Sequence, residues 1–123
     1  MGKTLKILLV DDDKALVKTL TMFLRYEGHE VEATTNPLEA FEIAGRSTFD
    51  LIIADYFMNQ MDGIELVDKC REKQFDLQAI LITGHWDKLN EAGDICAKFK
   101  AILPKPLDID QLVEELNSVK SVQ

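Results

Sequence analysis

The N-terminal part of the chain contains the stretch Ile7-Leu8-Leu9-Val10-Asp11-Asp12-Asp13, in which four apolar residues are followed at once by three acids. A short continuous apolar run is typical of a strand covered on both faces, as in the middle of a parallel sheet. Similar runs recur at residues 51–54 and 79–82, and weaker ones at 30–34 and 100–103. The sequence therefore predicts five strands.

Between these runs, apolar residues recur at helical spacing. The pattern predicts helices over about 14–27, 37–45, 64–73, 88–97 and 108–119. Asn36 can cap the second helix, where Pro37 fits the first helical position, whereas Gly93 makes the fourth helix less regular. Asp62-Gly63 predicts a turn in which Gly63 allows a positive φ. Strict alternation gives (βα)5, an α/β three-layer sandwich, because right-handed crossovers place helices on both faces of a parallel sheet.

The chain has 123 residues, with 14 Lys plus Arg against 22 Asp plus Glu and a net charge of −8. This length fits one domain, which we expect to span residues 1–123. The acidic charge without a basic block argues against direct binding to nucleic acid or membranes. Cys70 and Cys96 form no Cys-x-x-Cys motif, and we see neither a membrane span nor a signal peptide. We therefore expect free thiols and a cytoplasmic location.

Polar side chains follow four of the five predicted strands. The acids Asp11 to Asp13 follow the first strand and Asp55 follows the third. Thr83 follows the fourth strand, and Lys105 lies just past the fifth. The carboxyl ends of parallel strands share one edge of the sheet, where ligands bind. Carboxylates gathered there repel one another unless a cation intervenes, and Mg²⁺ suits several oxygen ligands. The acids therefore predict a divalent metal ion, beside which Lys105 and Thr83 could stabilise a phosphoryl group transferred to Asp55.

Taken together and in order, five motifs resemble the receiver domain of bacterial two-component response regulators. They are Ile7–Asp13, Asp50–Asp55, Met58–Gly63, Leu81–Gly84 and Leu103–Pro106, and the resemblance covers essentially the whole chain. It implies a flavodoxin-like fold with a parallel five-stranded sheet in the order 2-1-3-4-5. It also implies a phosphorelay switch with intrinsic self-phosphorylation and self-dephosphorylation chemistry, rather than an enzyme that turns over a substrate.

By this resemblance, Asp55 would accept a phosphoryl group from a sensor histidine kinase or a phosphotransfer protein. Mg²⁺ would be held by Asp11, Asp12, Asp55 and the backbone carbonyl of Phe57. The bond between Lys105 and Pro106 would be cis in this family. The resemblance thus assigns a phosphoacceptor and the protein ligands of the cation.

The resemblance also implies how the signal leaves the site. Lys105 would pair with the phosphoryl oxygen, and Thr83 would move to hydrogen-bond it, which changes the surface of the fourth helix, fifth strand and fifth helix. This surface would control an unknown output partner or effector domain, and a homodimer on activation fits the same scheme. Ile102 replaces the aromatic switch residue of many receivers. Phe57 and His85 occupy the two variable positions beside the phosphoryl group, where they would tune the phosphoaspartate lifetime.

Other functions fit the sequence less well. An aspartate-nucleophile phosphatase of the haloacid dehalogenase type usually needs a second aspartate two residues after the nucleophile, where this chain has Phe57. A flavodoxin-like flavin carrier needs a phosphate-binding loop after the first strand, and the three acids there would repel a phosphate. A receiver that only binds partners is disfavoured because the Asp, Thr and Lys set is complete. The sequence fits both a stand-alone regulator and a piece of a longer protein.

Overall fold

The computed structural model describes residues 3–85, 89 and 96–120 of the chain. The strands are β1 (Lys6–Val10), β2 (Glu30–Thr34), β3 (Leu51–Asp55), β4 (Gln78–Thr83) and β5 (Ala101–Pro104). The helices are α1 (Lys14–Tyr26), α2 (Pro37–Arg46), α3 (Gly63–Arg71) and α5 (Ile109–Asn117), with the short 3-10 helix η1 (Cys96–Lys98) before β5. The predicted helix over 88–97 lies largely outside the described residues.

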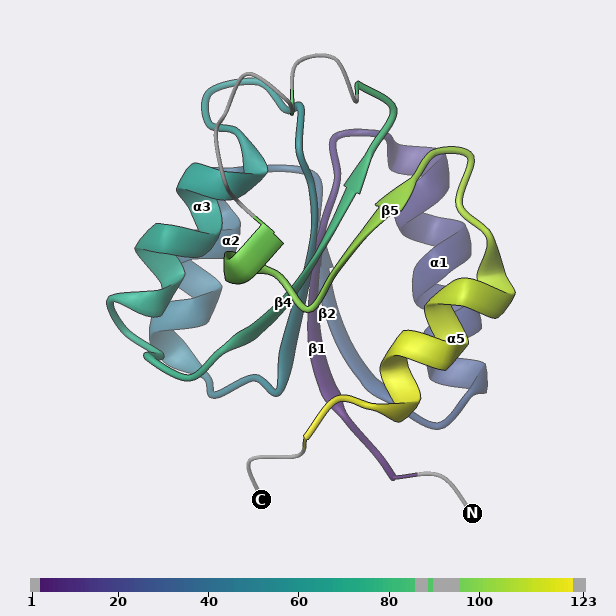
Figure 1. The fold of residues 1–123 in the computed structure, drawn as a ribbon. Coiled ribbons are helices and arrows are strands. Elements are labelled where there is room, and N and C mark those ends of the chain that lie inside the picture. The colour runs from purple at the N-terminus through teal and green to yellow at the C-terminus, as the bar shows by residue number, and fades with distance from the viewer. Residues whose placement is uncertain (1–2, 86–88, 90–95, 121–123) are drawn as a thin grey trace.

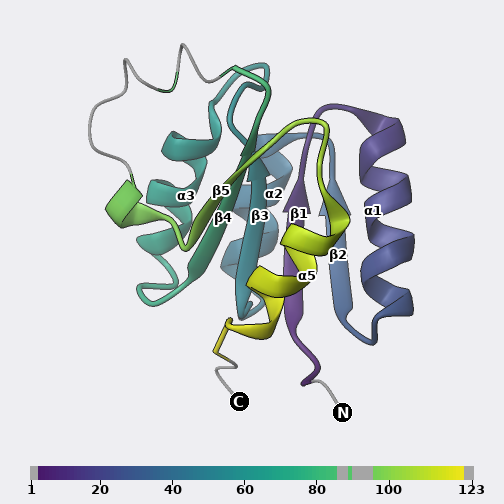
Figure 2. The same cartoon turned by 45° about the vertical axis from the view of Figure 1, so that its right-hand side comes forward.

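The five strands form one parallel sheet in the order β2-β1-β3-β4-β5. Helices α1 and α5 cover one face of this sheet and α2 and α3 cover the other, as Figure 1 and the turned view of Figure 2 show. The predicted flavodoxin-like three-layer sandwich is therefore confirmed. Among the described residues, no helix is long and apolar enough to cross a membrane.

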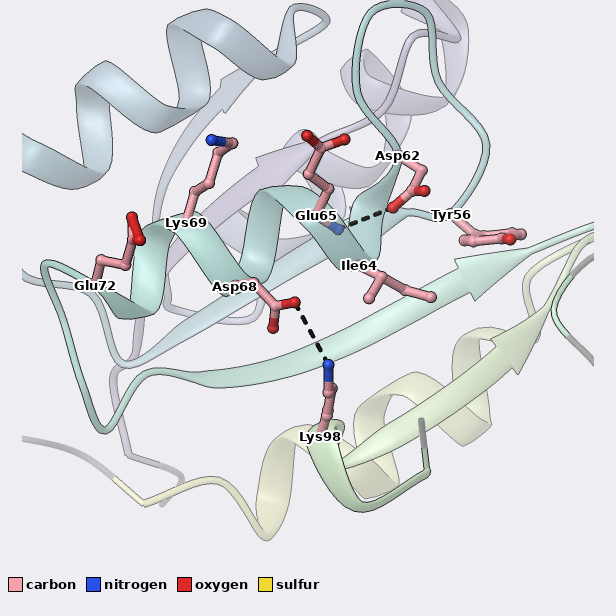
Figure 3. A pocket seen from close by; sticks show the side chains of 8 residues that line it. All are labelled: Tyr56, Asp62, Ile64, Glu65, Asp68, Lys69, Glu72 and Lys98. Atoms are coloured by element: carbon pink, nitrogen blue, oxygen red, sulfur yellow. Dashed lines mark hydrogen bonds and ion pairs between the residues drawn. The ribbon is translucent and has the colours of Figure 1, made fainter. Parts of the chain in front are cut away.

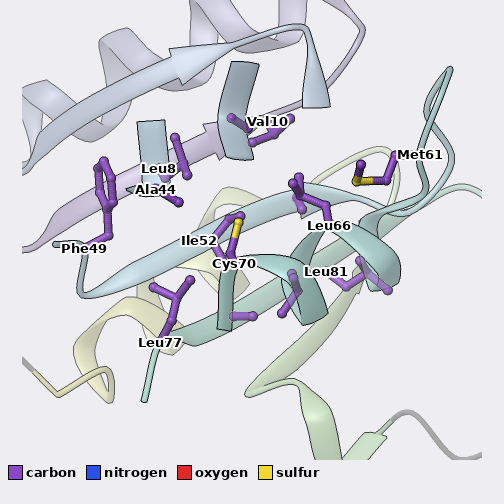
Figure 4. Close-up of a cluster of buried hydrophobic side chains, with 14 of the residues drawn as sticks. Leu8, Val10, Ala44, Phe49, Ile52, Met61, Leu66, Cys70, Leu77 and Leu81 are labelled. Atoms are coloured by element: carbon purple, nitrogen blue, oxygen red, sulfur yellow. The ribbon is translucent and has the colours of Figure 1, made fainter. Parts of the chain in front are cut away.

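The apolar core has two halves, one on each face of the sheet. On β1, Leu8 and Val10 join the half beneath α2 and α3, which Figure 4 shows, whereas Ile7 and Leu9 join the half beneath α1 and α5. This alternation follows from the two-residue repeat of a strand. It explains why the run is apolar at every position, and Asp11 directly follows the carboxyl end of β1.

Acids and amides cap the described helices. Asp13, Asn36 and Asp108 each accept hydrogen bonds from two backbone N–H groups in the first turn of α1, α2 and α5, and Asp62 accepts one in the first turn of α3. These caps fix where each helix begins, because a side-chain oxygen satisfies donors that the helix itself leaves unpaired. The predicted cap at Asn36 is confirmed. Cys70, on α3, is a buried free thiol.

The turn before α3 differs from the prediction. Gly63 is not among the residues with a positive φ, and Gln60 has a φ of 75° instead. Gly63 is needed for space, because a Cβ there would collide with the backbone carbonyl oxygen of Asp55. The predicted positive φ at Gly63 is therefore wrong, and the close approach of α3 to the end of β3 explains the glycine.

Candidate functional site

The polar residues predicted at the strand ends meet at one edge of the sheet. Asp11 follows β1, Asp55 is the last residue of β3, Thr83 is the last of β4, and Lys105 follows β5. The strands are parallel and adjacent, so their carboxyl ends bring together residues that are far apart in the sequence. Asp12 completes the group, as its carboxylate lies beside those of Asp11 and Asp55.

The three carboxylates form a compact oxygen cluster. One oxygen from each of Asp11, Asp12 and Asp55 lies within 4.8 Å of the others. Asp11 and Asp55 are 1% and 4% exposed, whereas Asp12 is exposed. Asp13 has a different task, because its side chain caps α1 and its backbone N–H donates to Oδ1 of Asp11 at 2.9 Å. The third acid of the run therefore positions the first.

Lys105 provides the positive charge of the site. Its Nζ lies 2.9 Å from Oδ2 of Asp11 and donates to Oδ2 of Asp55 at 3.2 Å. The Lys105 backbone N–H donates to the carbonyl oxygen of Thr83 at 2.9 Å, and the bond to Pro106 is cis, as the resemblance implies. A single ammonium thus bridges two buried carboxylates.

The pKa values of Asp55 and Lys105 reflect this arrangement. Burial, followed by the neighbouring charge of Asp11, raises the pKa of Asp55 to about 6, although Lys105 and a backbone hydrogen bond from Phe57 partly oppose the shift. Burial alone would lower the pKa of Lys105, but the paired acids outweigh it and the pKa is raised. Lys105 therefore stays charged. Its single positive charge does not balance the negative charges of the carboxylates around it.

The cluster fits a hard divalent cation. All its side-chain ligands are carboxylate oxygens, which Mg²⁺ prefers. The buried Oδ2 of Asp11 contacts the Lys105 ammonium at 2.9 Å, and Asp12 and Asp55 add further carboxylate oxygens beside it. A group of carboxylates with more negative than positive charge is suited to a further cation.

The remaining predicted residues surround the cluster at different depths. Thr83 is fully buried, and its Oγ1 accepts a hydrogen bond from the backbone N–H of His85 at 2.8 Å. The Phe57 and His85 rings lie 4.8 Å apart between centroids at 58°, with Phe57 48% exposed. Ile102 pairs with Leu81 in the sheet and packs against the core beneath α2 and α3. Ile102 is therefore a core neighbour of the site and not part of its rim.

A separate pocket of about 450 Å³ lies beside α3 (Figure 3). Its lining includes Tyr56, Ile64 and the exposed ion pair of Asp68 with Lys98 at 3.4 Å. None of the three clustered carboxylates is among the described residues that line it. The chemistry of the strand ends therefore belongs to the rim of the sheet and not to this pocket.

Comparisons with known proteins found similar chains among response regulators and transcriptional regulatory proteins. The chain is 28% identical over 115 residues to the response regulator MprA of Mycobacterium leprae, covering 94% of this chain and 50% of that protein. It is 30% identical over 115 residues to the transcriptional regulatory protein GlrR of Escherichia coli, covering 94% of this chain and 26% of that protein. The chain thus spans half or less of the length of these relatives.

Solved structures give the same result. A CheY-like response regulator receiver domain protein from Methanospirillum hungatei matches with a TM-score of 0.83 and 28% identity, over 93% of this chain and 91% of that one. The receiver domain of the hybrid histidine kinase CckA matches with a TM-score of 0.77 and 31% identity, over 90% of this chain and 94% of that one. The model of the response regulator receiver domain matches residues 7–117, and the chain therefore belongs to the response regulator receiver domain family.

Proposed function

We propose that this receiver domain switches state when Asp55 accepts a phosphoryl group from a sensor histidine kinase or a phosphotransfer protein. The observation that carries the proposal is the buried Asp55 carboxylate, 3.2 Å from the Lys105 ammonium and beside the acids Asp11 and Asp12. A carboxylate can act as a nucleophile toward phosphorus, and a fixed ammonium can stabilise the charge on the transferring group.

In the proposed transfer, a carboxylate oxygen of Asp55 forms a bond to phosphorus as the bond from phosphorus to the donor's histidine nitrogen breaks. The electron pair of that bond stays on the imidazole. Lys105 then exchanges part of its contact with Asp55 for a phosphoryl oxygen. Because Asp11 is also 2.9 Å from Lys105, the ammonium stays anchored during this exchange. The same carboxylate would react with small donors such as acetyl phosphate, with acetate leaving.

Asp11, Asp12, Asp55 and the backbone carbonyl of Phe57 would hold Mg²⁺. When bound, Mg²⁺ supplies positive charge that neutralises the phosphoryl oxygens. The buried position of Asp11 and its hydrogen bond from the Asp13 N–H support this assignment, because ligands that are fixed before binding lose little freedom.

Thr83 would carry the signal away from the site. Its hydroxyl now accepts from the His85 N–H, and a phosphoryl oxygen on Asp55 would offer it a new acceptor. A move of Thr83 would change the backbone after β4 and the surface formed by the fourth helix, β5 and α5. This change of surface would control the output partner or effector domain. A homodimer formed on activation is one way in which it could do so. Ile102, which is aliphatic, would take part through packing alone.

Phe57 and His85 would set the lifetime of the phosphoaspartate. Their rings contact each other at 4.8 Å, and Phe57 and His85 follow Asp55 and Thr83 by two residues each. A pair of rings at this place would control how readily water reaches the phosphoryl group, and so would tune the rate of hydrolysis. This is a tuning role, distinct from the phosphoacceptor role of Asp55.

The proposal extends to the wider context of the chain. Residues 1–123 would be one receiver unit that works in the cytoplasm, and either a separate output partner or an effector domain would supply the output. Incubation with acetyl phosphate should attach one phosphoryl group per chain in the presence of Mg²⁺ and none after chelation of the metal. Steady hydrolysis of a phosphomonoester such as p-nitrophenyl phosphate would instead favour the phosphatase alternative.

A further inference from the structure

A groove of about 540 Å³ lies between the segments that lead into β4 and β5. Its lining comes from the end of α3, the start of β4 and the residues just before β5, so the groove lies at the amino ends of these strands, whereas Asp55 is the last residue of β3. Three of the residues lining it, Leu77, Ala79 and Phe99, are buried to more than nine-tenths. The groove therefore has an apolar floor that is remote from the phosphoacceptor.

Phe75 makes the rim of this groove unusual. Its side chain is 91% exposed and lines the groove together with the nearly buried Phe99. A single exposed apolar residue needs no explanation, but an exposed aromatic side chain at the rim of an apolar groove offers a place where a partner could bury surface. The groove is thus suited to a bulky apolar side chain.

The groove also reverses the charge of the chain. Arg71, Lys98 and Lys100 line it with one acid, Asp76, whereas the whole chain has a net charge of −8. Arg71 is held in place because its Nε donates to the carbonyl oxygen of Leu77 at 2.9 Å. Lys98 forms an exposed ion pair with Asp68, at 3.4 Å, and such pairs are weak enough to exchange partners.

We propose that this groove binds an acidic protein segment that carries a bulky apolar side chain. The apolar side chain would pack between Phe75 and Phe99, and flanking carboxylates would pair with Arg71, Lys98 and Lys100. Charge complementarity selects this partner, because an acidic segment is repelled by most of the chain and attracted here. Nucleic acid fits less well, since three cations with an acid among them make few phosphate contacts against a charge of −8.

The proposal does not depend on phosphorylation of Asp55, and the experiment is designed to show this. The probe is an acetylated, amidated peptide of sequence Glu-Glu-Leu-Phe-Glu-Glu. It is titrated into isotopically labelled protein at low salt, and binding is followed by NMR. We expect saturable shifts at residues 71–79 and 97–100 and the same affinity for Asp55→Asn. This result would stand even if Asp55 accepted no phosphoryl group.

Matched variants separate the groove from general charge effects. The pair K98E and K100E should weaken peptide binding at least tenfold, and Phe75→Ser should weaken it severalfold. The pair K14E and K18E changes net charge equally, but on the exposed start of α1, and should bind nearly as wild type does. Circular dichroism checks that each variant is folded.

Three outcomes would overturn the inference. The first is shifts that are absent or centred elsewhere. The second is that the variant with K98E and K100E binds the peptide as tightly as wild type does, or that a control peptide with Gly-Ser in place of Leu-Phe binds wild type as tightly as the probe does. The third is tighter binding of an oligothymidine of the same charge to the same groove, which would indicate a nucleic-acid site.

Discussion

The Lys105 ammonium donates to Oδ2 of Asp55 at 3.2 Å, although the two residues are 50 positions apart in the sequence. The same ammonium lies 2.9 Å from Oδ2 of Asp11, so it is shared between two acids that are both nearly inaccessible to solvent. Burial and the second acid outweigh the ammonium and leave the pKa of Asp55 at about 6. The negative charge of the three carboxylates therefore exceeds the positive charge of Lys105, which favours the binding of another cation.

Asp11→Asn should weaken Mg²⁺ binding, because it removes one full negative charge from the oxygen cluster. We expect a loss of roughly tenfold or more in affinity, measured by calorimetric titration. Asp13→Asn is the matched control, since asparagine caps a helix as well as aspartate does and Asp13 contacts Asp11 through its backbone. Equal Mg²⁺ affinity of the two variants would contradict the assignment of ligands.

Lys105→Met should destabilise the fold in a pH-dependent manner. The folded pKa of Asp55 lies above its usual 3.8, so the folded state favours the neutral acid, and removal of Lys105 raises this pKa further. The penalty therefore appears as pH rises through the folded pKa. We expect a loss of about 1–2 kcal/mol in the free energy of unfolding near neutral pH, a modest value because the Lys105 side chain is partly exposed. Near pH 5 the loss should be smaller, because Asp55 is then largely neutral in the folded state.

Urea unfolding with Lys98→Met as the control tests this expectation. Lys98 pairs with Asp68, and both side chains are close to half exposed, so its loss should change the free energy of unfolding by less than about 1 kcal/mol at either pH. A Lys105→Met variant as stable as wild type near neutral pH would show that the ammonium does not compensate the buried acids.

Gln60→Gly should stabilise the fold. Gln60 has a φ of 75°, a conformation that costs a side-chain-bearing residue about 1 kcal/mol and glycine very little. We expect part of this energy to appear as a higher midpoint of thermal unfolding. Asn59→Gly is the control, since Asn59 is not among the positive-φ residues and glycine there only adds freedom to the unfolded chain. A lower midpoint for Gln60→Gly would contradict the strain.

His29 should titrate below its usual range. Burial lowers its pKa from 6.5, with Glu27 partly opposing, and Nδ1 accepts a hydrogen bond from the Leu5 N–H at 3.1 Å. Since the folded pKa is the lower one, the contribution to stability is present above the unfolded pKa and is lost as pH falls through the folded pKa. Wild type should therefore lose stability on acidification relative to His29→Asn, whose amide oxygen does not titrate.

NMR titration measures the His29 pKa directly. The chain has two histidines, so a His85→Gln variant assigns the signals. A His29 pKa at or above 6.5, or equal acid sensitivity of wild type and His29→Asn, would show that the hydrogen bond to Leu5 does not require the neutral ring.

Much of the site could be predicted because parallel strands place their carboxyl ends at one edge. Once the apolar runs before Asp11, Asp55 and Thr83 were identified as strands, their meeting followed from topology. Which acid of the run caps α1 depends on where that helix begins, and the structure gives this role to Asp13.

Other features depend on contacts that the sequence does not contain. Gly63 is required by the approach of α3 to the carbonyl oxygen of Asp55, a contact between two elements, and so the local prediction of a positive φ was wrong. The groove at Phe75 likewise forms from two segments about twenty residues apart. Its cations appear scattered along the sequence.

The most direct test of the account is the position of the phosphoryl group after reaction with acetyl phosphate and Mg²⁺. Borohydride reduction of the acyl phosphate followed by tandem mass spectrometry identifies the modified residue. The account predicts one modified residue, Asp55, and no incorporation in Asp55→Asn. Modification of Asp11, Asp12 or Asp13 in the wild type, or undiminished incorporation in Asp55→Asn, would contradict it.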